Sequence, residues 1–266
     1  MSRSESCSRA WLKICEDWKI LEHAFNKSPF ILNADQIKKS CQKFKKTSEK
    51  EVRILCKQDT REKRPDIFIS NNLFLLPVKN GCYNIIKGEG YVDIPKINMG
   101  TKIYSSKLDF ILDASKIGNS EMQHLDYAYA SSLIRTFMND NSLVLTIRGR
   151  KYTPSFSFTI NKQKINVKSV QTEVDAGYEG KEQVVLIEAK SFEAANIIIR
   201  QLFYPPPYRQ WQKTTNKKIV ILFFEKAISS NTYSIWQFEF INPDDYNSIK
   251  LIRSESFKIV EDSGIE

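Results

Sequence analysis

The sequence predicts a mixed α/β protein in which a mixed β-sheet is flanked by helices. Residues 183–189 and 218–224 are nearly continuous apolar runs, which is typical of central strands in a sheet covered on both faces. The Ala- and Ile-rich segment 192–202 lies between these runs and predicts a helix. Helices that alternate with buried strands along one chain are the pattern of this fold class.

The first 45 residues predict two helices. Large apolar side chains from Trp11 to Phe25 recur at three- and four-residue steps, which indicates an amphipathic helix over residues 8–26. Asn33 is a favourable N-cap for a second helix over residues 34–45.

A β-hairpin is predicted after these helices. Residues 67–76 and 82–86 read as strands, and Asn80-Gly81 between them is a strong hairpin-turn signal. Two helices followed by a hairpin are the outline of a winged helix or of a similar small recognition module.

A boundary between two domains is predicted near Pro95. Gly88, Gly90 and Pro95 interrupt the regular patterns at this point. We therefore predict a smaller N-terminal helical, winged-helix-like module over residues 1–95 and a second domain over residues 96–266.

The second domain begins with a predicted helix over residues 120–138, where apolar side chains from Met122 to Phe137 lie on one stripe. Residues 234–241 alternate between apolar and polar side chains, which predicts an edge strand. Further strands are predicted at residues 142–147, 155–160 and 165–173.

The composition favours a soluble protein with a polyanionic partner. Of the 266 residues, 41% are hydrophobic and 27% are charged, as in ordinary globular proteins. Forty Lys and Arg against 31 Asp and Glu give a net charge of +9, which favours nucleic acid as a partner.

The cysteines and histidines exclude several kinds of site. Five scattered cysteines without a C-x-x-C pair argue against a disulfide framework and a zinc site. With two histidines, a three-histidine metal site is excluded. No apolar run approaches the roughly 20 residues of a membrane-spanning helix, and the first residues lack the apolar stretch of a signal peptide. We therefore expect a cytoplasmic protein without membrane contact.

The most informative feature is the spacing of three charged residues. Twelve residues separate Asp175 from Glu188, and Glu188-Ala189-Lys190 closes the apolar run Val184 to Ile187. Side chains alternate along a strand, so Glu188 and Lys190 project from the same face. Two carboxylates can share a hard cation such as Mg²⁺ through oxygen ligands, and a lysine beside them can polarise a phosphate or an attacking water.

This Asp-x(12)-Glu-x-Lys pattern at the ends of two strands resembles the PD-(D/E)xK nuclease superfamily, and within it the type II restriction endonucleases. Val174 stands where the family name has proline. The resemblance implies a restriction-endonuclease-like core and Mg²⁺-dependent hydrolysis of phosphodiester bonds in double-stranded DNA, leaving a 5′ phosphate. Asp175 and Glu188 would hold the metal, and Lys190 would orient the water and stabilise the transition state.

Two further catalytic candidates follow from the resemblance. Many members of the superfamily carry another acidic residue on the helix before the sheet, and Glu121 matches that place, although an acid in a first helical turn also interacts favourably with the helix dipole. Many members also carry a polar residue on the helix after the Glu-x-Lys strand. Gln201 matches that place, with Arg200 as the alternative.

Basic and aromatic clusters are candidates for DNA contacts. The competing interpretation of the two basic clusters is a solvated surface, and that of the aromatic segment is a proline-stiffened loop whose aromatic side chains are packed down. The turn with Arg148, Arg150 and Lys151 can reach phosphates or guanine edges. Tyr204 and Arg209 lie in a segment that mixes aromatic and basic residues. A third cluster, residues 38–64, has a net charge of +7. Its candidates are Lys38, Lys39, Arg61 and Arg64.

The sequence therefore predicts a type II site-specific deoxyribonuclease of a restriction-modification system. Cleavage of both strands favours a homodimer, with a monomer on an asymmetric site as the alternative. Two other functions remain open: a nuclease of the same superfamily in DNA repair or recombination, and a non-catalytic DNA-binding protein of the same fold.

Overall fold

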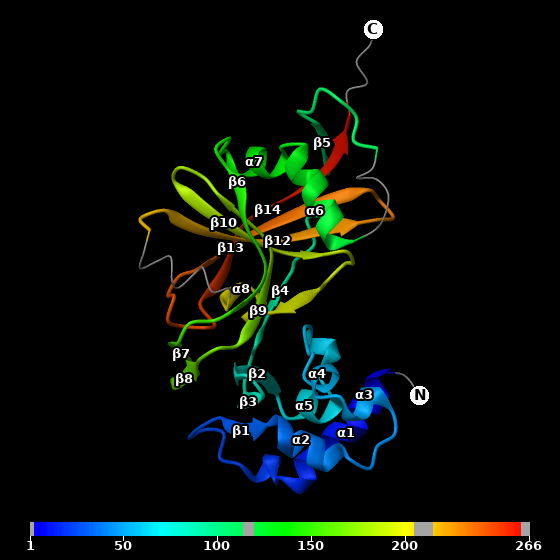
Figure 1. The fold of residues 1–266 in the computed structure, drawn as a ribbon, viewed down its shortest axis with the longest axis vertical. Coiled ribbons are helices and arrows are strands. Elements are labelled where there is room, and N and C mark those ends of the chain that lie inside the picture. The colour runs from blue at the N-terminus through cyan, green and yellow to red at the C-terminus, as the bar shows by residue number, and fades with distance from the viewer. Residues whose placement is uncertain (1–2, 114–119, 205–214, 262–266) are drawn as a thin grey trace.

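The computed structural model describes residues 3–113, 120–204 and 215–261. It contains a small N-terminal unit and a larger unit built on a seven-stranded sheet (Figure 1). The protein is thus of mixed α/β class with one large mixed sheet. None of the described helices is long and apolar enough to span a bilayer.

The N-terminal unit combines a three-stranded antiparallel sheet with short helices. The sheet has the order β1-β3-β2, with β1 at Phe30–Asn33, β2 at Leu73–Lys79 and β3 at Cys82–Lys87. Its core includes fully buried Trp11 and Phe68, whose rings lie 4.7 Å apart. The helices are α1 (Arg3–Asp17), η1 (Ile20–Glu22), α2 (Ala34–Cys41), α3 (Thr47–Lys50), α4 (Val52–Leu55), η2 (Arg61–Lys63) and α5 (Asp66–Ser70).

The large sheet has the order β5-β14-β13-β12-β10-β9-β6. Strand β10 pairs in parallel with β12 and antiparallel with β9, and β9 pairs antiparallel with β6. The strands are β5 (Lys102–Ser105), β6 (Val144–Tyr152), β9 (Gln171–Glu179), β10 (Gln183–Lys190), β12 (Lys218–Ala227), β13 (Thr232–Phe240) and β14 (Ile249–Val260).

Both faces of the large sheet are covered. Alternate residues of β10, such as Val185 and Ile187, face a core formed with α6 (Glu121–Ala130) and α7 (Leu133–Met138). Val184 and Leu186 point to the other face, where they share a core cluster with Phe74 of the N-terminal unit. That cluster also includes residues of three short elements: the hairpin β7 (Phe156–Ile160) and β8 (Gln163–Val167), and the helix α8 (Arg200–Phe203).

The N-terminal unit is docked on the large unit through a small two-stranded sheet, β4 (Tyr91–Asp93) with β11 (Asn196–Ile198). Asn196 accepts a hydrogen bond from the backbone N–H of Arg61 at 2.7 Å and donates to Glu62 at 2.8 Å. The N–H of Ile198 donates to the carbonyl of Asp59 at 2.9 Å. These contacts fix the segment from Asp59 to Glu62 beside the sheet.

The predicted helix over residues 192–202 is wrong. The structure has strand β11 and then one turn of helix, α8. The reason is the run Ile197-Ile198-Ile199, whose β-branched side chains favour strand. Asn196 to Ile199 are all buried, so the segment has no exposed face of the kind that an amphipathic helix presents.

Further predictions of element bounds are wrong. The helix predicted at residues 8–26 ends at Asp17 and is followed by η1, and the one predicted at residues 34–45 ends at Cys41. The strand predicted at residues 67–76 contains α5 before β2, and the one at residues 165–173 is divided between β8 and β9, with Ser169 at φ 55° between them. The helix predicted at residues 120–138 is interrupted at Ser132, whose φ is 64°. Left-handed backbone conformations like these two cannot continue a strand or a right-handed helix.

The predicted edge strand at residues 234–241 is internal. Strand β13 lies between β12 and β14, and six of its nine residues are buried. Strand β14 supplies the outer neighbour, so an alternating pattern here did not mark a sheet edge.

Candidate active site

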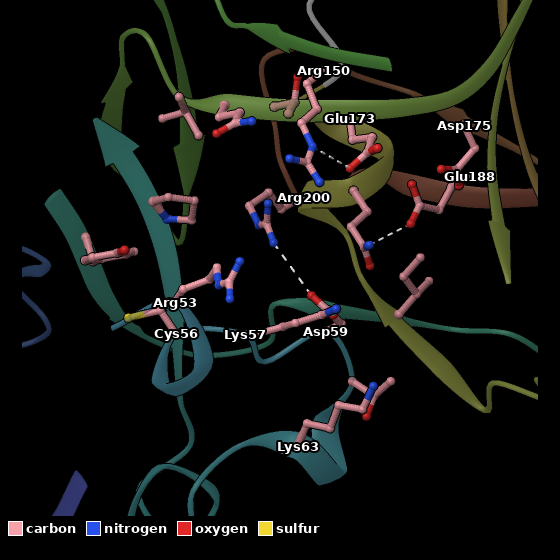
Figure 2. Close-up of a pocket in the computed structure, with 18 of the residues that line it drawn as sticks. Arg53, Cys56, Lys57, Asp59, Lys63, Arg150, Glu173, Asp175, Glu188 and Arg200 are labelled. Carbon is pink, nitrogen blue, oxygen red and sulfur yellow. Dashed lines mark hydrogen bonds and ion pairs between the residues drawn. The ribbon is translucent and has the colours of Figure 1, made fainter. Parts of the chain in front are cut away.

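Strands β9 and β10 place Asp175 opposite Glu188. Their antiparallel pairing runs from Val184 with Glu179 to Ile187 with Ala176, so the next opposed pair is Glu188 with Asp175. Opposed residues on antiparallel strands point to the same face. Figure 2 shows the two carboxylates beside each other at one end of a cleft.

The Asp175 carboxylate is anchored to the neighbouring strand. Its Oδ2 accepts a hydrogen bond from the backbone N–H of Ala189 at 2.7 Å. Burial raises the pKa of Asp175 above its ordinary value, against the opposing effects of the Ala189 hydrogen bond and of Lys190. The side chain is therefore held in a fixed orientation at a cost in desolvation.

The Glu188 carboxylate lies between two donors. Only 8% of Glu188 is exposed. Its Oε1 accepts hydrogen bonds from Lys190 Nζ and, at 2.6 Å, from Gln201 Nε2 on α8. Burial raises the pKa of Glu188 to about 7, although Lys190 acts in the opposite direction, and the negative charge of Asp175 adds to the increase.

The Lys190 ammonium keeps its charge inside the site. Burial favours the neutral amine, but the Glu188 carboxylate outweighs it, so the pKa of Lys190 is raised. Lys190 Nζ also donates to the carbonyl of Ala189 at 3.0 Å. A cation is thus fixed within hydrogen-bonding distance of one of the two acids.

Glu121 and Gln201 both join this cluster. Glu121 is the first residue of α6, and its Oε1 accepts from the backbone N–H of Ser191 at 3.3 Å, just beyond Lys190. Both residues line the same cleft as Asp175 and Glu188. The structure therefore brings together all five residues that the sequence singled out for catalysis.

The cleft has a volume of about 780 Å³ and is bounded by both units. The large unit supplies the acids, with Glu188 and Asp175 at one end (Figure 2). The N-terminal unit supplies the opposite wall. Its charged lining residues are Arg53, Lys57, Asp59, Lys63 and Lys79.

The two opposed carboxylates have the donor chemistry of a hard-cation site. Asp175 Oδ1 and Glu188 Oε2 take no hydrogen bond from the described residues. Burial raises the pKa of both carboxyl groups, and a divalent cation bound by them would offset that desolvation. Across residues 3–113, 120–204 and 215–261, no group of three or more His, Cys, Asp and Glu is placed to hold a metal. The candidate site therefore rests on two carboxylates, as the sequence predicted.

Of the three basic residues predicted in the turn near residue 149, Arg150 alone lines the cleft. Arg148 is engaged elsewhere, because it pairs with Asp126 of α6 and donates to the carbonyl of Asp175 at 3.2 Å. Lys151 is exposed on β6, outside the cleft lining. Arg148 thus connects α6 to the motif strand.

The predicted DNA contact through Tyr204 is wrong. Tyr204 is 1% exposed and packs among Phe156, Phe158 and Phe203 in the core. The ring packs against the β7–β8 hairpin, which agrees with the alternative of an aromatic side chain that is packed down. Arg209 lies outside the described residues.

The four basic candidates from residues 38–64 lie away from the cleft lining. Lys38 of α2 pairs with Asp35, and Lys39 of the same helix lies over the Trp18 ring. Arg61 pairs with Glu89 and Asp93, and Arg64 donates to two backbone carbonyls. Arg61 and Arg64 therefore serve the junction between the units.

Other basic residues of the same stretch line the cleft: Arg53, Lys57 and Lys63. The sequence signal that could have found them is the charge run itself, which contains all three. The docking of α4 and η2 decides which of these basic side chains face Asp175 and Glu188. No local sequence pattern specifies this docking.

Comparison with known families divides the chain in two. A model described as a domain of unknown function (DUF6996) matches residues 8–85, and one described as a domain of unknown function (DUF6997) matches residues 86–258. The searches of curated proteins and of solved structures found no match. Since the second model covers more than half of the chain, the protein belongs to the DUF6997 family.

Proposed function

We propose that the protein is a Mg²⁺-dependent endonuclease that hydrolyses phosphodiester bonds in double-stranded DNA, of the type II restriction class. The observation that carries this proposal is the convergence of Asp175, Glu188 and Lys190 on one wall of a cleft. Two opposed carboxylates with an adjacent ammonium match the chemistry that phosphoryl transfer to water requires.

The order of elements around the site supports a restriction-endonuclease-like core. Helices α6 and α7 precede the antiparallel strands β6, β9 and β10, and the short helix α8 leads into β12, which is parallel to β10. Helix, meander, motif strand, helix and strand are the order that the resemblance implies. The N-terminal unit has two helices around β1 and a hairpin, which supports a winged-helix-like docking module.

Asp175 and Glu188 would hold the cation through their carboxylate groups. When bound, Mg²⁺ supplies Lewis acidity, neutralising charge on the phosphate and acidifying water. The Ala189 N–H and Gln201 fix the two carboxylates, so the ligands are oriented before a substrate arrives.

Lys190 would stabilise the negative charge that develops on the phosphate. Its ammonium is already desolvated and oriented by Glu188, so little reorganisation is needed in the transition state. In the hydrolysis the water oxygen forms a bond to phosphorus while the bond between phosphorus and the 3′ oxygen breaks. The 3′ oxygen gains a proton and leaves as a hydroxyl, and the phosphate stays on the 5′ end.

The test is digestion of a defined plasmid with and without Mg²⁺, followed by sequencing of the fragment ends. We expect cleavage at one sequence that is lost in Asp175→Ala, while binding to a duplex is kept, because Asp175 would hold the metal and not the DNA. Mg²⁺ binding, measured by calorimetry without DNA, should be lost in the same variant. Activity of Asp175→Ala near the wild-type rate would contradict the proposal, and cleavage confined to branched or damaged DNA would instead indicate a repair nuclease.

A further inference from the structure

Three arginines from three separate elements point into the cleft (Figure 2). Arg53 comes from α4 of the N-terminal unit, Arg150 from β6 and Arg200 from α8. Like charges repel, so such a grouping is unfavourable unless anions balance it. The question is whether the protein itself supplies those anions.

The carboxylates near these arginines balance them only in part. Arg150 is paired with Glu173 at 3.3 Å, but both side chains are more than half exposed, at 69% and 56%, so the pair is screened by water. Arg200 lies 3.8 Å from Asp59, and its Nε is buried without a hydrogen-bond partner. Arg53 is exposed and makes no ion pair or hydrogen bond with the described residues. A buried, unsatisfied guanidinium nitrogen is costly and indicates a missing acceptor.

Both walls of the cleft carry positive charge, and the paired acids lie on one of them. The N-terminal wall adds Lys57, Lys63 and Lys79 to Arg53, with Asp59 as its acidic lining residue. The large unit carries Arg150 and Arg200 together with Glu188 and Asp175. A polyanion that passes between the units would meet positive charge on both walls and the candidate cation site on one.

We propose that Arg53, Arg150 and Arg200 form a phosphate-binding subsite that holds a backbone phosphate of the DNA other than the one that is cleaved. The inference rests on the proposed function and extends it, because it makes the N-terminal unit part of the substrate site. Guanidinium groups bind phosphate oxygens through paired, charge-assisted hydrogen bonds. The contact carries no sequence information and sets the position of the strand.

The test is the affinity of a short labelled duplex, measured by fluorescence anisotropy in EDTA over a range of KCl concentrations. Arg53→Ala is the informative variant, since this side chain supports no other contact among the described residues. We expect about tenfold weaker binding, because hydrogen bonds to charged groups are the strong ones. The slope of log affinity against log salt should fall by about 1.

Two variants serve as controls. Lys43→Ala removes one positive charge from the same unit at an exposed position outside the cleft lining, and it should leave both affinity and slope close to wild type. Arg53→Lys keeps the charge without the planar fork, so it should restore the salt slope but only part of the affinity.

Equal losses in Arg53→Ala and Lys43→Ala would overturn the subsite, because they would reveal a diffuse effect of net charge. Unchanged binding in Arg53→Ala together with Mg²⁺-dependent cleavage by wild type would overturn the subsite and leave the proposed function intact. A specific loss in Arg53→Ala by a protein that cuts no DNA would support the subsite and overturn the nuclease.

Discussion

Two buried lysines on neighbouring strands, Lys190 and Lys226, differ in whether a carboxylate lies beside the ammonium group. This difference distinguishes the candidate active site from the rest of the sheet. Lys190 ends β10, and Lys226 lies near the end of β12, one residue beyond Glu225, the parallel partner of Lys190. Successive residues of a strand point to opposite faces, so the two ammonium groups project to opposite sides of the sheet. Both are buried: the Lys190 side chain is 14% exposed and Lys226 is 4% exposed.

The pKa values of the two lysines are shifted in opposite directions because their neighbours differ. Lys226 bonds to the amide oxygen of Asn231 and lies 3.8 Å from the centre of the Tyr233 ring. Both neighbours are neutral, and burial lowers the pKa of Lys226 to about 8. Burial also acts against the charge of Lys190, but Glu188 lies beside it, and its pKa is raised. Burial alone weakens a positive charge, and the carboxylates opposed across β9 and β10 are what preserve it.

The largest effect expected from this comparison is on cleavage. Lys190→Met keeps most of the side-chain volume and removes the ammonium, so we expect the cleavage rate to fall about a thousandfold, as when one preorganised donor to a transition state is lost. Lys226→Met, on the other face, is the matched control and should retain the wild-type rate. Initial rates on a supercoiled plasmid at saturating Mg²⁺ measure both.

The result is interpretable only if Lys190→Met still folds, which its circular dichroism and duplex binding report. Loss of activity in both lysine variants would refute the distinction between the two faces. Retained activity in Lys190→Met would remove Lys190 from the mechanism.

The next effect is on stability and concerns Lys226. Its folded-state pKa, about 8, lies below the unfolded value near 10.5, so the folded protein binds fewer protons than the unfolded chain between these two pH values. Stability therefore increases as pH rises through this window, and the cost of burying the charge is fully present below pH 8. Lys226→Met removes that cost and should stabilise the protein at pH 7 by on the order of 2 kcal/mol.

Urea unfolding of wild type and Lys226→Met from pH 6 to pH 10 tests this prediction. Other groups titrate in the same range, but they are common to both proteins and cancel in the difference. The stability advantage of the variant should shrink above pH 8. A constant difference across the whole range would mean that burial of the methylene chain, not of the charge, sets the effect.

The strands that carry the motif were predictable from sequence because their signal is local and strong. The run from Val184 to Ile187 and the carboxylate that ends it specify both a buried strand and the face of Glu188. Segment 192–202 failed because its Ala and Ile content is compatible with a helix or a strand. The segment forms a strand because it pairs with β4, which lies far away in the sequence.

The site was predictable to the same extent. Asp175, Glu188 and Lys190 lie on two strands joined by a tight connection, so spacing alone brings them together. Arg53 and Arg200 approach the cleft from different units, and their proximity depends on how Asp59 and Asn196 dock the units. Tyr204 could not be assigned from sequence for a similar reason, since the choice between a DNA contact and a packed aromatic ring depends on the β7–β8 hairpin against which it lies.

The smallest expected effect concerns two side-chain amides, Gln201 near Lys190 and Asn231 beside Lys226. Gln201 donates to the carboxylate of Glu188 at 2.6 Å, whereas Asn231 accepts from Lys226 itself. In the cleft the amide positions a metal ligand, so Gln201→Ala should lower the cleavage rate about tenfold, in line with one hydrogen bond to a charged group. Asn231→Gly is the control, because its φ of 52° suits glycine and its loss affects only Lys226. Cleavage rates at rising Mg²⁺ concentration separate the roles: excess Mg²⁺ restores activity if Gln201 orients a metal ligand, and a deficit that persists at saturation means that Gln201 contacts the substrate instead.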